Sequence, residues 1–227
     1  MIEKKKEVKK IFDSIAWRYD LLNHLLSFGM DIYWRKKAIK ITGLSSESIL
    51  LDVACGTGDV AIEARKQGAI NIFGADYSFE MLKLFEKKSG WIKKRTVQMV
   101  AENLPVKDES VSNITVAFGV RNFYDIQEGF NSFYRILKRE GKATIIEFRL
   151  PSNPFLKGLY KFYFKKILPA VGGLISGNRE AYKYLPRSVE EFDEKINMPE
   201  LLRNAGFRKI EVYSLTFGIV QTIIAAK

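Results

Sequence analysis

The sequence predicts an α/β fold: a doubly wound, seven-stranded, mostly parallel sheet with one antiparallel C-terminal strand and an N-terminal helical cap. Three observations predict it. From residue 48 onward, short β-branched runs alternate with longer helical patterns. A glycine-rich turn follows the first of these runs. Only Thr216, Phe217 and Gly218 separate the last two runs, which allows a hairpin.

Apolar residues at helical spacing come first, from Val8 to Ile15 and again from Ile32 to Ile41, and predict helices ahead of the sheet. The strands are expected at 49–53, 70–75, 96–100, 114–118, 143–148, 209–215 and 220–226. The helices between them are expected at 59–67, 79–88, 126–137, 154–168 and 199–204. No repeat and no linker divides the chain, so we expect one domain.

The composition excludes several classes of protein. With 227 residues, of which 47% are hydrophobic and 28% charged, the chain can bury a sizeable core and is not a disordered protein. Cys55 is the only cysteine and His24 the only histidine. These counts exclude a disulfide framework, zinc sites built from several cysteines and multi-histidine metal centres. We therefore expect no metal.

The sequence predicts a cytoplasmic protein. The first residues, 1–10, are charged and lack the apolar segment of a secretory signal. The longest weakly polar stretches, 167–176 and 216–226, reach half of the roughly 20 residues that a membrane-spanning helix needs. We expect no segment to cross a bilayer.

Basic residues outnumber acidic ones and lie in clusters. The net charge is +11, and two runs, 87–101 and 148–179, contain no acidic residue. Such patches bind nucleic acid, anionic lipid or an acidic small molecule, or they form a solvated lysine-rich surface. All of these interpretations stay open at this point.

A glycine loop follows the first predicted strand. Gly56 and Gly58 allow a tight turn and a close approach by a ligand, in a spacing that also fits the dinucleotide fingerprint. Asp52, at the strand end, can accept hydrogen bonds from an ammonium group or from the loop amides. Asp76 ends the next strand, where a carboxylate can bind both hydroxyls of a ribose. The loop predicts a nucleoside ligand; the alternative for Asp76 is a cap on the following helix.

The segment from Asp52 to Asp59, together with Asp76, resembles the nucleoside loop of class I S-adenosylmethionine-dependent methyltransferases, which have a Rossmann-like fold. Two more specific stretches, 19–23 and 119–122, resemble signatures of the ubiquinone/menaquinone biosynthesis C-methyltransferases. The resemblance extends from about Val8 to the last strand. It implies an enzyme that transfers a methyl group from S-adenosylmethionine to a carbon of a demethylated isoprenoid quinol.

The resemblance also implies a cofactor site at the strand ends. Thr57 and Gly58 would lie beside the methionine part, Asp76 on the ribose, the residues after the third strand along the adenine, and Ala117 near the sulfonium. The implied cofactor-binding residues are Asp52, Gly56, Thr57, Gly58, Asp76, Tyr77, Val100, Ala101 and Ala117.

Methyl transfer to a ring carbon needs more than alignment of the carbon with the methyl group. A ring hydroxyl must lose its proton, and the resulting phenolate must be stabilised. We expect Arg121 to supply the cation and Asn122 to hydrogen-bond the ring oxygen, since both follow the fourth strand. Tyr19, Asp20 and Asn23, from the cap, are expected to close over the ring and position a water. The alternative for Arg121 is a surface ion pair with Asp125.

Three other residues receive structural interpretations. His24 is expected on a helix surface, and Cys55 is expected to pack inside the glycine loop. Glu147, at the end of the fifth strand, is expected either to orient substrate or to pair with Arg149.

The domain spans 1–227, with a helical cap at 1–47, a cofactor-binding core at 48–150, a helical substrate lid at 151–200 and a C-terminal hairpin at 201–227. In the lid, lysines recur every fourth residue from Lys157 to Lys165 among aromatic residues. The segment from Lys157 to Lys166 is therefore expected to rest on anionic membrane, or to be a lid helix with its lysines in water.

Two alternative functions stay open. The basic patches permit a methyltransferase of the same fold that acts on another small molecule or on RNA, although the sequence favours a quinol or phenolic substrate. Departures from the family pattern at Asp31, Ala117 and Arg149 suggest a non-catalytic, cofactor-binding partner subunit. The sequence predicts no oligomeric state.

Overall fold

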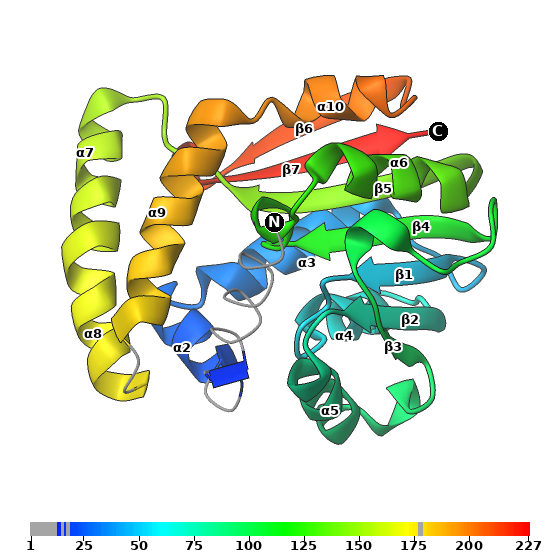
Figure 1. The fold of residues 1–227 in the computed structure, drawn as a ribbon, viewed down its shortest axis with the longest axis horizontal. Helices are drawn as coiled ribbons and strands as arrows, with labels where there is room; N and C mark the ends of the chain where they lie inside the picture. Colours follow the sequence, from blue (N-terminus) through cyan, green and yellow to red (C-terminus); the bar gives the residue numbers. More distant parts are fainter. Residues whose placement is uncertain (1–12, 15, 17–18, 177–178) are drawn as a thin grey trace.

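The computed structural model describes residues 13, 14, 16, 19–176 and 179–227, and the helix predicted from Val8 to Ile15 lies almost entirely outside them. Seven strands form one sheet in the order β3-β2-β1-β4-β5-β7-β6 (Figure 1). The strands are β1 (Ile49–Val53), β2 (Asn71–Asp76), β3 (Thr96–Gln98), β4 (Val111–Ala117), β5 (Leu137–Phe148), β6 (Lys209–Leu215) and β7 (Val220–Ala226).

The predicted fold class is confirmed, with β7 as the antiparallel strand. β7 pairs antiparallel with both β5 and β6, so it lies one place in from the edge of the sheet. The turn Thr216–Gly218 (η6) folds β7 back between these two strands. Because both neighbours pair along the whole of β7, the strand is buried from Ile223 to Ala225.

Helices cover both faces of the sheet. The helices are α2 (Tyr19–Leu26), α3 (Met30–Thr42), α4 (Asp59–Lys66), α5 (Phe79–Lys88), α6 (Ile126–Ile136), α7 (Pro154–Phe162), α8 (Leu168–Ser176), α9 (Arg179–Lys195) and α10 (Met198–Asn204). One core joins α6, α9 and α10 to the sheet through Phe130, Phe192 and Leu202. On the other face, α3, α4 and α5 bury Ile39, Ala61 and Phe85.

The lid differs from its prediction in two ways. The helix expected at 154–168 is α7, and a π-helical turn at Tyr163–Ile167 continues it into α8. Helix α9 was not predicted, since Pro186 lies inside it and charged residues dominate its sequence. Val189 and Phe192 nevertheless bury one side of α9, and this tertiary packing outweighs its poor local pattern.

The glycine loop is held in left-handed backbone conformations. Gly56 has φ 54° and Gly58 has φ 86°, which favour glycine. Gly58 also packs so closely on Phe85 that an added Cβ would lie 2.1 Å from the ring. The loop therefore turns from β1 into α4 at the carboxyl edge of the sheet.

The cap and the lid face that same edge. In Figure 1, α2 and the helices α7, α8 and α9 stand together across from the carboxyl ends of the parallel strands. In doubly wound folds this edge is where ligands bind. Among the described residues, no helix combines the length and the apolar character needed to span a membrane.

Gly58→Ala tests the packing of the loop. The added methyl group must displace the Phe85 ring at a backbone conformation that alanine rarely adopts, so we expect a loss of at least about 2 kcal/mol of unfolding free energy. Urea denaturation without cofactor measures it. The control is Gly90→Ala, where an added Cβ meets nothing within 4 Å; equal stability of the two variants would contradict the packing argument.

Candidate active site

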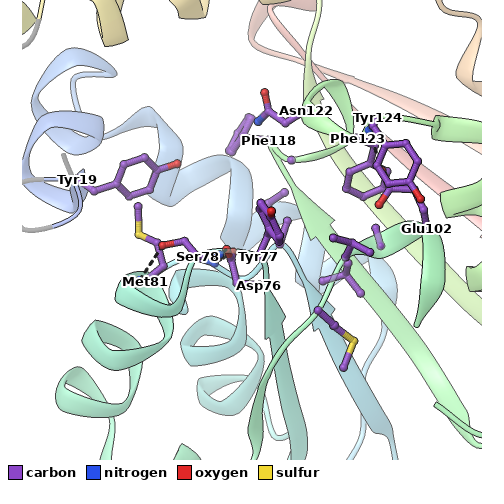
Figure 2. A pocket seen from close by; sticks show the side chains of 18 residues that line it. Tyr19, Asp76, Tyr77, Ser78, Met81, Glu102, Phe118, Asn122, Phe123 and Tyr124 are labelled. Carbon is purple, nitrogen blue, oxygen red and sulfur yellow. Dashed lines mark hydrogen bonds between the residues drawn. The ribbon is translucent and has the colours of Figure 1, made fainter. Parts of the chain in front are cut away.

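A cavity of about 130 Å³ opens at the carboxyl ends of β1, β2 and β4 (Figure 2). The sequence prediction includes eight of its eighteen lining residues. The predicted residues that line it are Tyr19, Gly56, Asp76, Tyr77, Val100, Ala101, Ala117 and Asn122. Lining residues that were not predicted include Ser78, Met81, Met99, Glu102, Phe118, Phe123 and Tyr124.

Asp76 forms the carboxylate wall of this nucleoside cavity. One of its oxygens accepts a hydrogen bond from the backbone N–H of Gly56 and the other from that of Ser78, each at 2.8 Å. Burial raises the pKa of Asp76, although these hydrogen bonds act in the opposite direction. The N-cap of α5 is Ser78, whose hydroxyl accepts from the N–H of Met81 at 3.2 Å. Asp76 is therefore not the cap that the alternative prediction proposed.

The nucleoside cavity has the chemistry that an adenosine sulfonium needs. Gly56 lines it, and an added Cβ there would meet no atom within 4 Å, so the glycine leaves space for a ligand. Val100, Ala101 and Ala117 add small apolar walls suited to a flat base. With Asp76 opposite as an acceptor for hydroxyl groups, the residues present fit S-adenosylmethionine.

Three predicted cofactor-binding residues do not line the cavity in this structure. Asp52 is buried beneath the loop and accepts from the Thr115 hydroxyl at 2.7 Å; burial raises its pKa to about 7. The Thr57 hydroxyl donates to Asp20 of the cap. Gly58 faces the Phe85 ring. These three residues therefore contact other parts of the protein and do not form the cavity wall.

A second cavity, of about 530 Å³, lies next to the first and shares Tyr19 and Phe118 with it. Its walls come from the cap, the lid and the η6 turn, and they are mostly aromatic and aliphatic. Among them are Trp34, Phe148, Tyr160, Tyr163, Phe164, Tyr184 and Phe217. The two shared residues mark where ligands in the two cavities would meet.

Arg121 lies at the wall of this larger cavity, in a buried ion pair. Its Nη1 lies 2.8 Å from Oε1 of Glu147 and also donates to the carbonyl of Phe118. Although burial opposes the charge, Glu147 raises the pKa of Arg121. The expected alternative partner, Asp125, instead caps α6 by accepting from the N–H of Glu128 at 3.0 Å.

The predicted ion pair between Glu147 and Arg149 is wrong. Glu147 is fully buried and is bound to Arg121, whereas the Arg149 guanidinium lies 3.7 Å from the Asp193 carboxylate. Arg121, the expected cation, is thus neutralised by an ion pair with Glu147. Its Nε is buried and has no hydrogen-bond partner among the described residues.

Tyr19 lines both cavities and Asn122 lines the first, and Figure 2 shows the two side chains apart from each other. Burial raises the pKa of Tyr19, whereas a hydrogen bond with the Asn23 side chain lowers it. Oδ1 of Asn122 accepts from the Tyr184 hydroxyl at 2.8 Å. Tyr184 was not predicted, because no pattern in the sequence connects α9 with the turn after β4.

An ion network fastens the cap to the glycine loop. Asp20 accepts from Thr57, and Lys88 of α5 lies 2.9 Å from Asp20 and also pairs with Asp59 at the start of α4. Arg35 of α3 lies 3.5 Å from Asp59. The cap, the loop and α5 are therefore joined through alternating charges.

The network continues to His24, which was expected on a helix surface. Its Nδ1 lies 2.7 Å from Asp31, and Asp31 also binds Arg35. Although burial opposes ionisation, Arg35 lowers the pKa of Asp31. Ligand atoms of His24, Asp31 and Asp59 lie within 4.8 Å of one another. Arg35 binds both carboxylates, so this cluster has a structural explanation without a metal ion.

Comparison with known proteins identifies the family. The family model described as the ubiE/COQ5 methyltransferase family matches residues 1–227. The chain belongs to this family. Relatives include the ubiquinone/menaquinone biosynthesis C-methyltransferase UbiE of Geotalea uraniireducens, 41% identical over 100% of this chain and 99% of the relative. The demethylmenaquinone methyltransferase of Chlorobaculum parvum is also 41% identical, over 98% of this chain and 93% of its own length.

A solved structure supports the fold of this ubiE/COQ5 methyltransferase. An S-adenosylmethionine-dependent methyltransferase from Thermotoga maritima superposes with a TM-score of 0.67 over 96% of this chain and 99% of that one, at 19% identity. The predicted family and fold are confirmed. The chain is an S-adenosylmethionine-dependent methyltransferase, which confirms the predicted enzyme class and cofactor.

Asp76→Asn tests the nucleoside cavity of this methyltransferase. An amide keeps the size of the side chain but cannot accept at both positions, so affinity for S-adenosylhomocysteine is expected to fall about 10- to 100-fold. Titration calorimetry measures it. The control is Asp108→Asn, an exposed carboxylate paired with Arg135; unchanged affinity in D76N with a normal melting temperature would refute the assignment.

Proposed function

We propose that this methyltransferase methylates a ring carbon of a demethylated isoprenoid quinol, as in the biosynthesis of menaquinone or ubiquinone. The larger cavity carries the proposal. It is apolar, holds about 530 Å³, and meets the nucleoside cavity at Tyr19 and Phe118. A polyprenylated ring needs such a volume, and its polar oxygens need the few polar groups that line it. The names of the relatives describe the same reaction.

S-adenosylmethionine, when bound, supplies a methyl group on a positively charged sulfur. Gly56, Asp76 and the walls formed by Val100 and Ala101 would hold it. The residues of the larger cavity exclude water and hold the ring so that one carbon faces the junction.

Polar groups near the place where the two cavities meet form hydrogen bonds with the ring oxygens. The Nε–H of Arg121 donates to an oxygen that becomes negative as its proton leaves, and Asn122, fixed by Tyr184, hydrogen-bonds beside it. Tyr19 and Asn23 position a water that accepts the proton. Because Glu147 already neutralises Arg121, the guanidinium acts here as a directed donor more than as a net charge.

RNA receives less support as a substrate. Several lysines of the acid-free runs are engaged within the protein: Lys88 binds Asp20 and Asp59, and Lys161 and Lys165 both bind Glu190 of α9. A basic groove for a phosphate backbone would need such charges to be unpaired.

A membrane contact is also proposed, with a different surface from the one expected. Glu190 of α9 binds Lys161 of α7 and Lys165 of the π-helical turn, whereas several apolar side chains that line the larger cavity are exposed. This apolar rim consists of Phe28, Leu159, Phe162, Ile167 and Phe217, which are 40–82% exposed and line the cavity. We propose that the rim lies in the cytoplasmic face of a bilayer, so that the quinol enters without crossing water.

Turnover tests the substrate. Purified protein with radiolabelled S-adenosylmethionine is expected to methylate reduced, demethylated menaquinol or ubiquinol, but neither simple phenols nor RNA. Arg121→Lys keeps a cation beside Glu147 but removes the Nε donor, so turnover should fall at least about tenfold while S-adenosylhomocysteine still binds. Methylation of RNA alone, or of no quinol, would refute the proposal.

Vesicle binding tests the rim. The double variant Phe162→Ser, Phe217→Ser should partition into phosphatidylglycerol-containing vesicles at least about tenfold more weakly than the unchanged protein, because two exposed aromatic side chains no longer enter the lipid. Sedimentation measures it. Phe79→Ser is the control, since Phe79 is 50% exposed on α5 outside the rim. Equal losses in both variants would argue against a specific rim.

A further inference from the structure

One polar group in the larger cavity is left without a function by the reaction described above. Tyr160, on α7, is 7% exposed and lines the cavity. Its hydroxyl is buried and has no hydrogen-bond partner among the described residues. A buried donor without a partner lowers stability, and a ligand bound in the cavity could satisfy one whose side chain lines it.

Two other tyrosines of the same cavity show the contrast. The Tyr163 hydroxyl donates to the carbonyl of Leu26 at 2.6 Å, and the Tyr184 hydroxyl donates to Asn122 at 2.8 Å. Both have a structural partner. Tyr160 is also fixed, because its ring stacks on Phe164 with centroids 4.0 Å apart and planes 21° apart. Its hydroxyl cannot turn to solvent without breaking this stack.

The hydroxyl of Tyr160 keeps its proton under physiological conditions and has that proton to donate. Burial raises its pKa, and the neighbouring carboxylate of Glu147 adds to this, although Arg121 opposes it. The proton therefore stays on the oxygen. A ligand that satisfies it must present an acceptor.

A second buried donor of the same cavity also lacks a partner. The Nε of Arg121 is buried, belongs to a side chain that lines the cavity, and is unsatisfied among the described residues. Ring contacts place both side chains in one region of the cavity. Tyr160 stacks on Phe164, whose ring centroid lies 6.0 Å from that of Phe148, and the Arg121 guanidinium carbon lies 5.6 Å from the Phe148 centroid. The rest of the wall there is aromatic. An aromatic ring with two oxygens matches two donors set in an apolar cavity.

We propose that Tyr160 is a substrate-binding residue: its hydroxyl donates to one oxygen of a dioxygenated aromatic ring while Arg121 Nε donates to the other. This inference rests on the proposed function and deepens it. The cavity then selects rings with two oxygens over rings with one, because the analogue with one oxygen leaves a buried donor unsatisfied. Prenyl length would not contribute to this selection.

Tyr160→Phe tests the inference through binding, without turnover. In the S-adenosylhomocysteine complex under anaerobic conditions, the unchanged protein should bind a short-chain prenyl naphthohydroquinone about tenfold more tightly than the matched naphthol with one hydroxyl. Y160F should lose this preference and bind both alike. Its melting temperature without ligand should stay equal or rise, because an unsatisfied buried hydroxyl has been removed.

Two control variants separate substrate binding from structure. Tyr163→Phe removes a hydroxyl that has a partner, so its melting temperature should fall. Thr222→Val removes another buried hydroxyl without a partner among the described residues, on β7 and outside the lining of both cavities. T222V should match Y160F in stability while keeping the preference for two oxygens.

Three outcomes would overturn the inference: no preference in the unchanged protein, a preference retained in Y160F, or a fall in melting temperature in Y160F like that of Y163F. A different result would refute the proposed function. A protein that binds the naphthohydroquinone through Tyr160 but transfers no methyl group to any quinol refutes that function and leaves the role of Tyr160 intact.

Discussion

The buried ion pair between Arg121 and Glu147 is the contact on which the substrate side of the molecule depends. It joins the turn after β4 to the end of β5, at 2.8 Å and with both side chains almost fully buried. Removing one partner of such a pair leaves an uncompensated charge, which typically costs about 3–5 kcal/mol. The pair therefore fixes the turn that carries Arg121 and Asn122. It also neutralises the charge of a guanidinium that lines a large apolar cavity.

The cap reaches the junction of the two cavities through a second set of charges. Asp20 is held by Thr57 of the glycine loop and by Lys88, and its neighbour Tyr19 is thereby directed to the place that both cavities share. Asp31, a departure from the family pattern, binds Arg35 within the same network. The departure thus has a structural role and is no sign of lost catalysis.

Sequence patterns predicted those parts of the site that are formed by residues close together in the chain. The loop from Gly56 to Gly58 and the carboxylate of Asp76 follow from a strand, a tight turn and a helix in succession. Partnerships between distant segments left no such signal. Glu147 lies 26 residues from Arg121, and Tyr184 lies 62 residues from Asn122. The segment from Lys157 to Lys166 was expected to rest on a membrane or to be a lid helix, and its sequence does not show that Glu190 of α9 binds Lys161 and Lys165.

The η6 turn adds an independent argument for a contact at the apolar rim. Thr216 and Phe217 have φ of 46° and 55°, left-handed values that are unfavourable for both residue types. The Trp34 indole donates to the Thr216 hydroxyl at 2.7 Å and holds the turn in place. The result is a phenylalanine that is 82% exposed. A strained backbone that exposes an aromatic ring to water does not stabilise the fold. Burial of that ring in a lipid surface would offset the backbone strain.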